Sequence, residues 1–186
     1  MAKINLIPTS ISDMVILDPQ IFKDERGYFM ETYNAEEFNK IGLHMTFVQD
    51  NESKSKKGVL RGLHFQTSYP QGKLVRVLQG SVFDVGVDLR AGSSTYGKWE
   101  GVILSGQNKR MLYIPEGFAH GFLVLSDIAV FTYKCTNIYY PQYDWGIRYD
   151  DPDIGIQWPT ADIQKIILSD KDKALPSLKE LKITFK

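Results

Sequence analysis

The sequence contains little cysteine, no excess charge of either sign and no long apolar run. Cys135 is the only cysteine in 186 residues, which excludes a framework of disulfides within the chain. Lys and Arg number 22 and Asp and Glu also number 22, so the broad positive field typical of nucleic-acid binders is missing. No apolar stretch approaches the ~20 residues that cross a bilayer, and no charged-then-apolar leader is visible. We therefore expect a cytoplasmic protein that binds neither nucleic acid nor membranes.

The glycine spacing in the middle of the chain predicts many short strands. Eleven of the 15 glycines lie between Gly58 and Gly121, with 4 to 11 residues from one to the next. Residues 81–89 alternate between apolar and carboxylate-bearing positions, as in a strand with two different faces. Further strands are expected at 73–78, 99–104, 110–114, 120–125 and 129–135. The pattern predicts a mainly β fold with closed sheets, and the length predicts a single domain over residues 1–186.

Two short helices and one loop are expected outside these strands. Asn34 and Glu37 have the spacing of a capping box, which predicts a helix start, and Gly42 predicts its end. The isoleucines of 163–167 have helical spacing and predict a second helix. The polar run NESKSKKG at 51–58 predicts a loop.

Two of the three histidines, His64 and His120, lie in apolar segments bracketed by glycines. A metal site needs three or more converging ligands, and the residue two positions after His64 is Gln66 rather than another histidine. We therefore expect no metal. For each histidine the competing interpretation is a core side chain hydrogen-bonded to backbone. Asp84 falls on the polar face of its strand and is a candidate partner of Lys73 or His64.

Basic residues accompany His64 on neighbouring segments. Alternation places Lys73 and Arg76 on opposite faces of one strand, and we expect Lys73 to face the interior and Arg76 the solvent. A cation inside a barrel is costly unless an anion or a developing negative charge lies beside it. Arg61 precedes His64 by three residues, so both reach one pocket only if the strand bends at Gly62.

Two tyrosines are candidates for chemistry or stacking. Tyr133 shares a strand face with Cys135, so it points inward if Cys135 does. A buried tyrosine hydroxyl either donates a proton to a reacting carbon or makes an ordinary core hydrogen bond. Tyr139 is either a platform that stacks on a planar ring or an exposed loop residue.

Nine motifs occur in order along the chain: DERGYF at 24–29, FVQDN at 47–51, VLRGLHFQ at 59–66, QGKLVRV at 71–77, FDV at 83–85, IPEGFAHGF at 114–122, YKCT at 133–136, DDPDIGIQWP at 150–159 and LSDKD at 168–172. Together they resemble one family, the dTDP-4-dehydrorhamnose 3,5-epimerases, over almost the whole chain. The resemblance implies a cupin-type jelly-roll (double-stranded β-helix) barrel with short flanking helices. It also implies an isomerase that uses no cofactor.

The implied reaction epimerises C3 and C5 of dTDP-4-dehydro-6-deoxy-D-glucose to give dTDP-4-dehydro-L-rhamnose, in dTDP-L-rhamnose biosynthesis. By resemblance, His64 is the base, Asp170 orients it, Lys73 stabilises the enolate and Tyr133 is the acid. Histidine suits the first role because its charge changes near neutral pH. The alternatives are a single-site 3- or 5-epimerase of another dTDP-deoxysugar pathway, a non-catalytic sugar-nucleotide-binding cupin, and a metal-dependent cupin enzyme.

The resemblance also implies how the dTDP-sugar is bound. The polar binding residues are Arg26, Glu31, Gln49, Asn51, Arg61, His120, Asp144 and Lys171, and Tyr139 stacks on the base. Ile138 and Asp144 depart from the pattern, because the family often has an aromatic residue and a longer Glu there. The resemblance further implies a homodimer with strand exchange near the amino terminus. The sequence leaves open whether Arg26 and Glu31 act in their own subunit or in the partner's site.

Overall fold

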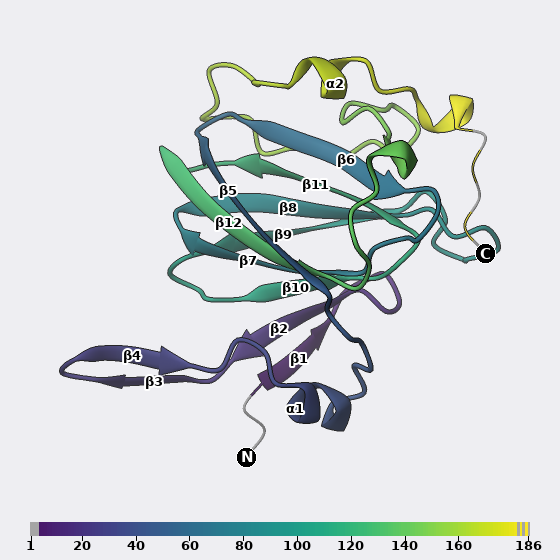
Figure 1. Cartoon of the computed structure of the whole chain (residues 1–186). Helices are drawn as coiled ribbons and strands as arrows, with labels where there is room; N and C mark the ends of the chain where they lie inside the picture. The colour runs from purple at the N-terminus through teal and green to yellow at the C-terminus, as the bar shows by residue number, and fades with distance from the viewer. Residues whose placement is uncertain (1–3, 182, 184, 186) are drawn as a thin grey trace.

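The computed structural model describes residues 4–181, 183 and 185. Within this part of the chain, strands dominate and form two sheets that face each other, with a separate hairpin to one side (Figure 1). One sheet has the order β1 (Ile4–Pro8), β2 (Val15–Pro19), β10 (Met111–Ile114), β7 (Lys73–Gln79), β12 (Ile128–Cys135) and β5 (Gln49–Lys56). The other has the order β13 (Asp144–Gly146), β6 (Leu60–Gln66), β11 (Phe118–Val124), β8 (Ser81–Asp88) and β9 (Trp99–Ser105). The pairings within both sheets are antiparallel, and the mainly β jelly-roll prediction is confirmed.

Apolar side chains fill the space between the two sheets. Phe131 of β12 and Phe122 of β11 stack with their ring centroids 4.2 Å apart, which joins the two sheets. β8 follows its predicted alternation. Val82 packs in this inner core, whereas Val85 packs on the other face, under the carboxyl-terminal segments. The buried Asp84 has the same parity as Val82, so this strand carries a carboxylate into the interior.

The first predicted helix is confirmed. α1 (Ala35–Lys40) begins after Asn34, whose side chain accepts hydrogen bonds from the backbone N–H of Glu36 at 3.0 Å and of Glu37 at 3.3 Å. Gly42 follows the helix with φ +84°, a left-handed conformation that ends helices readily. The capping signal in the sequence therefore located the helix correctly.

The other two local predictions are wrong. Residues 51–58 belong largely to β5, because pairing with β12 imposes a strand in which lysines and Glu52 point outward. Charged residues suit such an edge strand. Residues 163–167 form no helix; Ile167 instead makes a bridge to Val59, and its N–H donates to Gly58 O at 2.8 Å. The second helix is α2 (Asp170–Lys173), further along the chain.

A hairpin of β3 (Ile21–Asp24) and β4 (Gly27–Met30) projects from the barrel (Figure 1). It exposes the aromatic side chains of Phe22, Tyr28 and Phe29. Short 3₁₀ turns occur at Pro141–Tyr143 and Leu178–Glu180. No helix among the described residues is long and apolar enough to cross a membrane.

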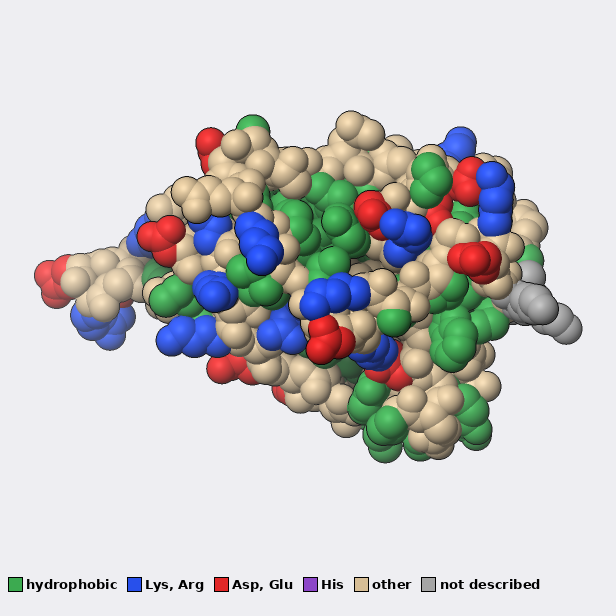
Figure 2. Space-filling model, turned by 90° about the horizontal axis from the view of Figure 1, so that it is seen from above, with side chains coloured by type: hydrophobic (Ala, Val, Ile, Leu, Met, Phe, Trp, Pro, Cys, Tyr) green, Lys and Arg blue, Asp and Glu red, His purple; other side chains and the backbone are tan. Residues whose placement is uncertain are grey.

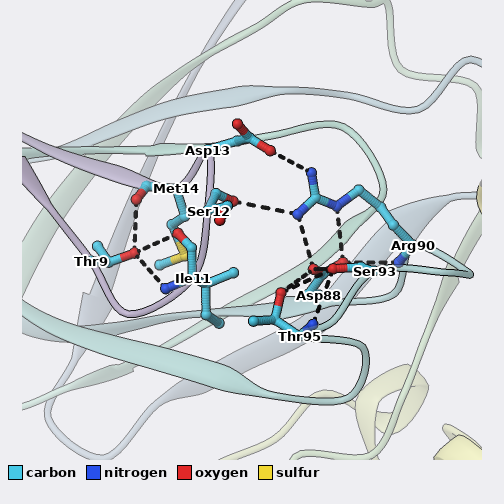
Figure 3. A network of polar contacts seen from close by, with 9 residues as sticks. All are labelled: Thr9, Ile11, Ser12, Asp13, Met14, Asp88, Arg90, Ser93 and Thr95. Carbon is cyan, nitrogen blue, oxygen red and sulfur yellow. Dashed lines mark hydrogen bonds and ion pairs between the residues drawn. The ribbon is translucent and has the colours of Figure 1, made fainter.

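A polar network ties the turn between β1 and β2 to the loop after β8 (Figure 3). Arg90 donates to both carboxylate oxygens of Asp88, at 3.0 and 2.9 Å, and to Asp13 at 2.8 Å. The hydroxyls of Ser93 and Thr95 also donate to Asp88. Burial raises the pKa of Asp88, but these hydrogen bonds, led by those from Arg90, outweigh it and lower the pKa to about 2.

Candidate active site

A cavity of about 590 Å³ opens at the end of the barrel that carries α2. Side chains from both sheets line it, and the segment 167–172 closes one side. Figure 2 views the molecule from the side on which α2 lies, where Lys and Arg side chains are found beside a recessed area of hydrophobic side chains. The predicted residues that line the cavity are Asn51, Arg61, His64, Lys73, His120, Tyr133 and Lys171. The cavity therefore collects candidates from distant parts of the sequence.

His64 forms a short hydrogen bond with Asp172. The distance from His64 Nε2 to Asp172 Oδ1 is 2.6 Å, and the Asp172 side chain is only 4% exposed. Burial raises the pKa of Asp172, but the hydrogen bond and the electrostatic interaction with His64 outweigh it, so the pKa lies below its usual value. An ionised, buried carboxylate thus fixes the orientation of an imidazole that lines the cavity.

The prediction that Asp170 orients His64 is wrong. The Asp170 side chain is 98% exposed and pairs with Lys173 at 2.7 Å. Both aspartates lie on α2, and the phase of this single turn points Asp172 at the barrel and Asp170 at solvent. The sequence contains a signal for this helix, because a serine three residues before an acidic residue, as in Ser169 and Asp172, predicts a helix start. In the structure Ser169 Oγ accepts the N–H of Asp172 at 3.1 Å.

Lys73 is the buried cation of the site. It begins β7, lines the cavity and lies on the strand face opposite to Arg76, which borders a different hollow, so the predicted division is confirmed. Burial lowers the pKa of Lys73, and this effect is opposed by the acidic groups of Cys135, Asp144 and Asp84. An ammonium in this position attracts any negative charge that develops in the cavity.

A second buried pair joins His120 to Asp84. His120 Nε2 lies 3.0 and 3.1 Å from the two oxygens of Asp84. The predicted partners of Asp84, Lys73 and His64, are therefore wrong as direct contacts. Burial lowers the pKa of His120, although Asp84 opposes this shift. A neutral ring that donates from Nε2 to Asp84 leaves Nδ1 as an acceptor.

The strand β6 bends as the spacing of Arg61 and His64 requires. The pairing of β6 with β11 shifts register between His120 and Phe122. Gly62 has φ +108°, and a Cβ there would lie 2.5 Å from His120 O. Because of this irregularity both Arg61 and His64 line the cavity, which confirms the prediction.

Arg61 and Tyr133 complete the chemically distinctive lining. Arg61 donates from Nε and Nη2 to the hydroxyl of Ser55, at 3.2 and 3.1 Å. Tyr133 and Cys135 point inward on the same face of β12, as predicted. Burial raises the pKa of Tyr133, so its hydroxyl is protonated at neutral pH.

Gln49, Tyr139 and Asp144 lie beside the cavity rather than in its lining. Gln49 Oε1 accepts the N–H of Tyr139 at 2.8 Å, and Gln49 Nε2 donates to Asn51 at 3.0 Å. The Tyr139 hydroxyl donates to Asp144 Oδ2 at 2.6 Å, and Asp144 pairs with Lys171. The hydrogen bond to Asp144 raises the pKa of Tyr139 to about 12.

Two predicted binding residues lie elsewhere in this chain. Arg26 is at the turn of the projecting hairpin, exposed and paired with Asp24, and Glu31 follows β4. Neither residue lines this cavity.

Gln66 has a structural role at the position where a metal-binding cupin would offer a second ligand. Its Nε2 donates to Tyr69 O at 2.8 Å and Ile138 O at 3.1 Å, and its Oε1 accepts the N–H of Tyr140 at 2.6 Å. The side chain therefore fastens two loops together. Within the described residues, no group of three or more His, Cys, Asp or Glu side chains is arranged to hold a metal.

Comparisons with known proteins find relatives along nearly the whole chain. A family model described as dTDP-4-dehydrorhamnose 3,5-epimerase matches residues 8–180. The dTDP-4-dehydrorhamnose 3,5-epimerase of Methanothermobacter thermautotrophicus is 57% identical over 180 residues, which is 97% of each chain. A crystal structure of the dTDP-6-deoxy-D-glucose-3,5-epimerase of Legionella pneumophila, with dTDP-4-keto-L-rhamnose, has TM-score 0.95 at 49% identity and 98% coverage of both chains. A 3'-monoepimerase from Streptomyces bikiniensis with dTDP-quinovose has TM-score 0.85 at 35% identity, covering 92% of this chain and 87% of that one.

Proposed function

The chain belongs to the dTDP-4-dehydrorhamnose 3,5-epimerase family, and from this premise we propose that it epimerises C3 and C5 of dTDP-4-dehydro-6-deoxy-D-glucose. The product is dTDP-4-dehydro-L-rhamnose, in dTDP-L-rhamnose biosynthesis. The observation that carries the proposal is the His64–Asp172 pair, which shares one cavity with the buried Lys73 and with Tyr133. Residues 1–186 act as one epimerase domain.

His64 removes a proton from the carbon next to the C4 ketone. Its Nε2 is bonded to Asp172, so Nδ1 is the nitrogen left to accept the proton. The imidazolium that forms is stabilised by the Asp172 carboxylate, which is already ionised and desolvated. Asp172 therefore takes the role that the resemblance gave to Asp170.

Proton removal moves negative charge onto the ketone oxygen, and Lys73 stabilises this enolate. The ammonium is buried before the reaction, so its attraction to the developing charge is screened little by water. Loss of one such donor typically costs roughly 3 to 4 kcal/mol in the barrier. Tyr133, kept protonated by burial, returns a proton to the opposite face of the carbon.

The remaining lining binds the nucleotide part of the substrate. Arg61 and Lys171 offer cations to the diphosphate, Asn51 and His120 offer polar contacts, and Arg61 is already oriented by Ser55. Beside the cavity, Tyr139 presents its ring to the base, and Gln49 fixes the backbone at that tyrosine.

We also propose a cytoplasmic homodimer in which the projecting β3–β4 hairpin reaches the partner. The exposed aromatic rings of Phe22, Tyr28 and Phe29 support this, because a projecting two-stranded hairpin with apolar side chains gains stability by covering them. This arrangement brings Arg26 and Glu31 to the partner's cavity, where they contact the dTDP-sugar. The single cysteine, Cys135, is buried and free, as suits a reducing compartment.

Product analysis by proton NMR in heavy water tests the proposed function. The protein is incubated with dTDP-4-dehydro-6-deoxy-D-glucose, and deuterium is expected at both C3 and C5 of the product. Label at C3 alone would identify a single-site epimerase. This is the second candidate function, because the structure is also similar to that of a 3'-monoepimerase. Absence of label with retained dTDP binding would identify a non-catalytic binder.

A further inference from the structure

The segment 168–174, here called the arch, contains α2, which lies against β6 at the edge of the barrel (Figure 1). Residues of the arch, Asp172 among them, line one side of the cavity. Backbone hydrogen bonds fix the chain on both sides of the arch. Leu60 N–H donates to Ile167 O at 3.0 Å on one side, and Arg148 N–H donates to Pro176 O at 2.9 Å on the other. The arch itself contains only the single turn of α2.

Among the described residues, two polar side-chain contacts connect the arch to the barrel. One is the hydrogen bond of Asp172 to His64, and the other is the ion pair of Lys171 with Asp144. The remaining polar side-chain contacts of the arch are internal, from Asp172 N–H to Ser169 and from Lys173 to Asp170. Of the polar contacts that hold the arch on the barrel, one is therefore made by Asp172 itself and the other by the neighbouring Lys171.

Asp144 is well placed to hold the arch. It begins β13, which pairs with β6 so that Asp144 lies opposite Gln66 and Gly146 opposite His64. Its side chain is 13% exposed, against 46% for Lys171. Asp144 Oδ2 accepts the Tyr139 hydroxyl at 2.6 Å and also receives the Lys171 ammonium, and the residue does not line the cavity. The carboxylate thus faces protein groups on two sides.

We propose that Asp144 is a positioning residue, whose carboxylate holds Lys171 and thereby keeps the arch, with Asp172, in hydrogen-bond contact with His64. This inference rests on the proposed function for its kinetic consequences. It differs from the role implied by the resemblance, in which Asp144 contacts the substrate itself. The two roles predict opposite kinetic signatures.

The substitution Asp144→Asn removes the charge and keeps an acceptor for the Tyr139 hydroxyl. A half-exposed ion pair is a weak restraint, but catalysis is sensitive to small displacements of an orienting group. We expect kcat to fall roughly three- to tenfold. KM should be unchanged or lower, because Lys171, which contacts Asp144 and also lines the cavity, no longer divides its charge between the Asp144 carboxylate and the diphosphate. A substrate-contact role would instead raise KM and leave kcat unchanged.

Hydrogen exchange provides a readout that does not depend on activity. Amide exchange in residues 168–174 is expected to be faster in Asp144→Asn than in the wild-type protein. The conservative variant Asp144→Glu keeps a carboxylate within reach of the flexible Lys171 and is expected to restore most of kcat. The matched control is Asp50→Asn, which also removes an aspartate from a pair with a lysine, Lys134, but on the opposite side of the sheet. It should leave kcat, KM and arch exchange unchanged.

A double-mutant cycle on kcat completes the test. If Asp144 acts through Lys171, the loss of kcat in Asp144→Asn and Lys171→Met combined is smaller than the product of the two single losses. The inference would be overturned if the combined loss of kcat equalled the product of the two single losses. It would also be overturned if Asp144→Asn raised KM without changing kcat, or if it left amide hydrogen exchange in residues 168–174 unchanged. A wild-type protein without epimerase activity would overturn the proposed function, and the exchange measurement would then still decide whether Asp144 holds the arch.

Discussion

The substitution Asp172→Asn removes the charge that the structure places against the imidazole of His64, the proposed base. The carboxylate lies 2.6 Å from His64 Nε2 and its side chain is 4% exposed, so solvent screens the contact little. A hydrogen bond to a charged group contributes roughly 1.5–3 kcal/mol. This energy stabilises the transition state if it arises as His64 becomes an imidazolium. Removing the carboxylate charge then lowers kcat by about 10- to 150-fold, at about 1.4 kcal/mol per factor of ten.

The assay is the initial rate of epimerisation at saturating substrate, with circular dichroism to verify that the variant is folded. Asp170→Asn is the matched comparison, because it removes a carboxylate from the same helical turn that contacts only Lys173 among the described residues. It is expected to retain wild-type kcat. A larger loss in Asp170→Asn than in Asp172→Asn would refute the assignment drawn from the geometry.

Three further predictions follow from other parts of the fold. Gly62→Ala is expected to lower the free energy of unfolding, measured by urea titration, by about 1–3 kcal/mol. The reason is that φ at Gly62 is +108° and a Cβ there would lie 2.5 Å from His120 O. A variant as stable as the wild-type protein would contradict the role of Gly62 in bending β6. Asp88 has its pKa lowered from 3.8 to about 2, so its stabilisation is present above pH 3.8 and is lost as the pH falls through 2. The loss is about 2 kcal/mol in the free energy of unfolding. Asp88→Asn should therefore flatten the dependence of this free energy on pH in the same range. An unchanged dependence would contradict the stabilisation of the Asp88 carboxylate by Arg90. Phe29→Ser is expected to weaken the proposed homodimer, so that light scattering detects monomer at concentrations where the wild-type protein is dimeric; an unchanged mass would count against the hairpin contact.

The parts of the site that follow from strand periodicity were predictable. Alternation along the strand placed Lys73 inside and Arg76 on the other face, and both positions are confirmed. The spacing of Arg61 and His64 required an irregular strand, and Gly62 was the residue able to provide it. In each case a local rule of backbone geometry decided the answer.

The parts that depend on long-range packing were not predictable from the same rules. The sequence offers two aspartates within LSDKD, and only the docking of α2 on β6 decides that Asp172 meets His64. The partner of Asp84 is fixed by the register of β8 against β11, which brings His120 to it. The polar composition of residues 51–58 indicated a loop, but pairing with β12 outweighed it.

The central claim is that proton transfer at the sugar carbons is performed by side chains that converge from separate strands, beginning with His64. The most direct measurement compares His64→Ala with the wild-type protein for deuterium uptake at C3 and C5 in heavy water, with dTDP binding measured on the same samples. The account predicts that the variant binds dTDP and incorporates deuterium at both carbons no faster than the protein-free control. Wild-type exchange in a folded His64→Ala protein would contradict it.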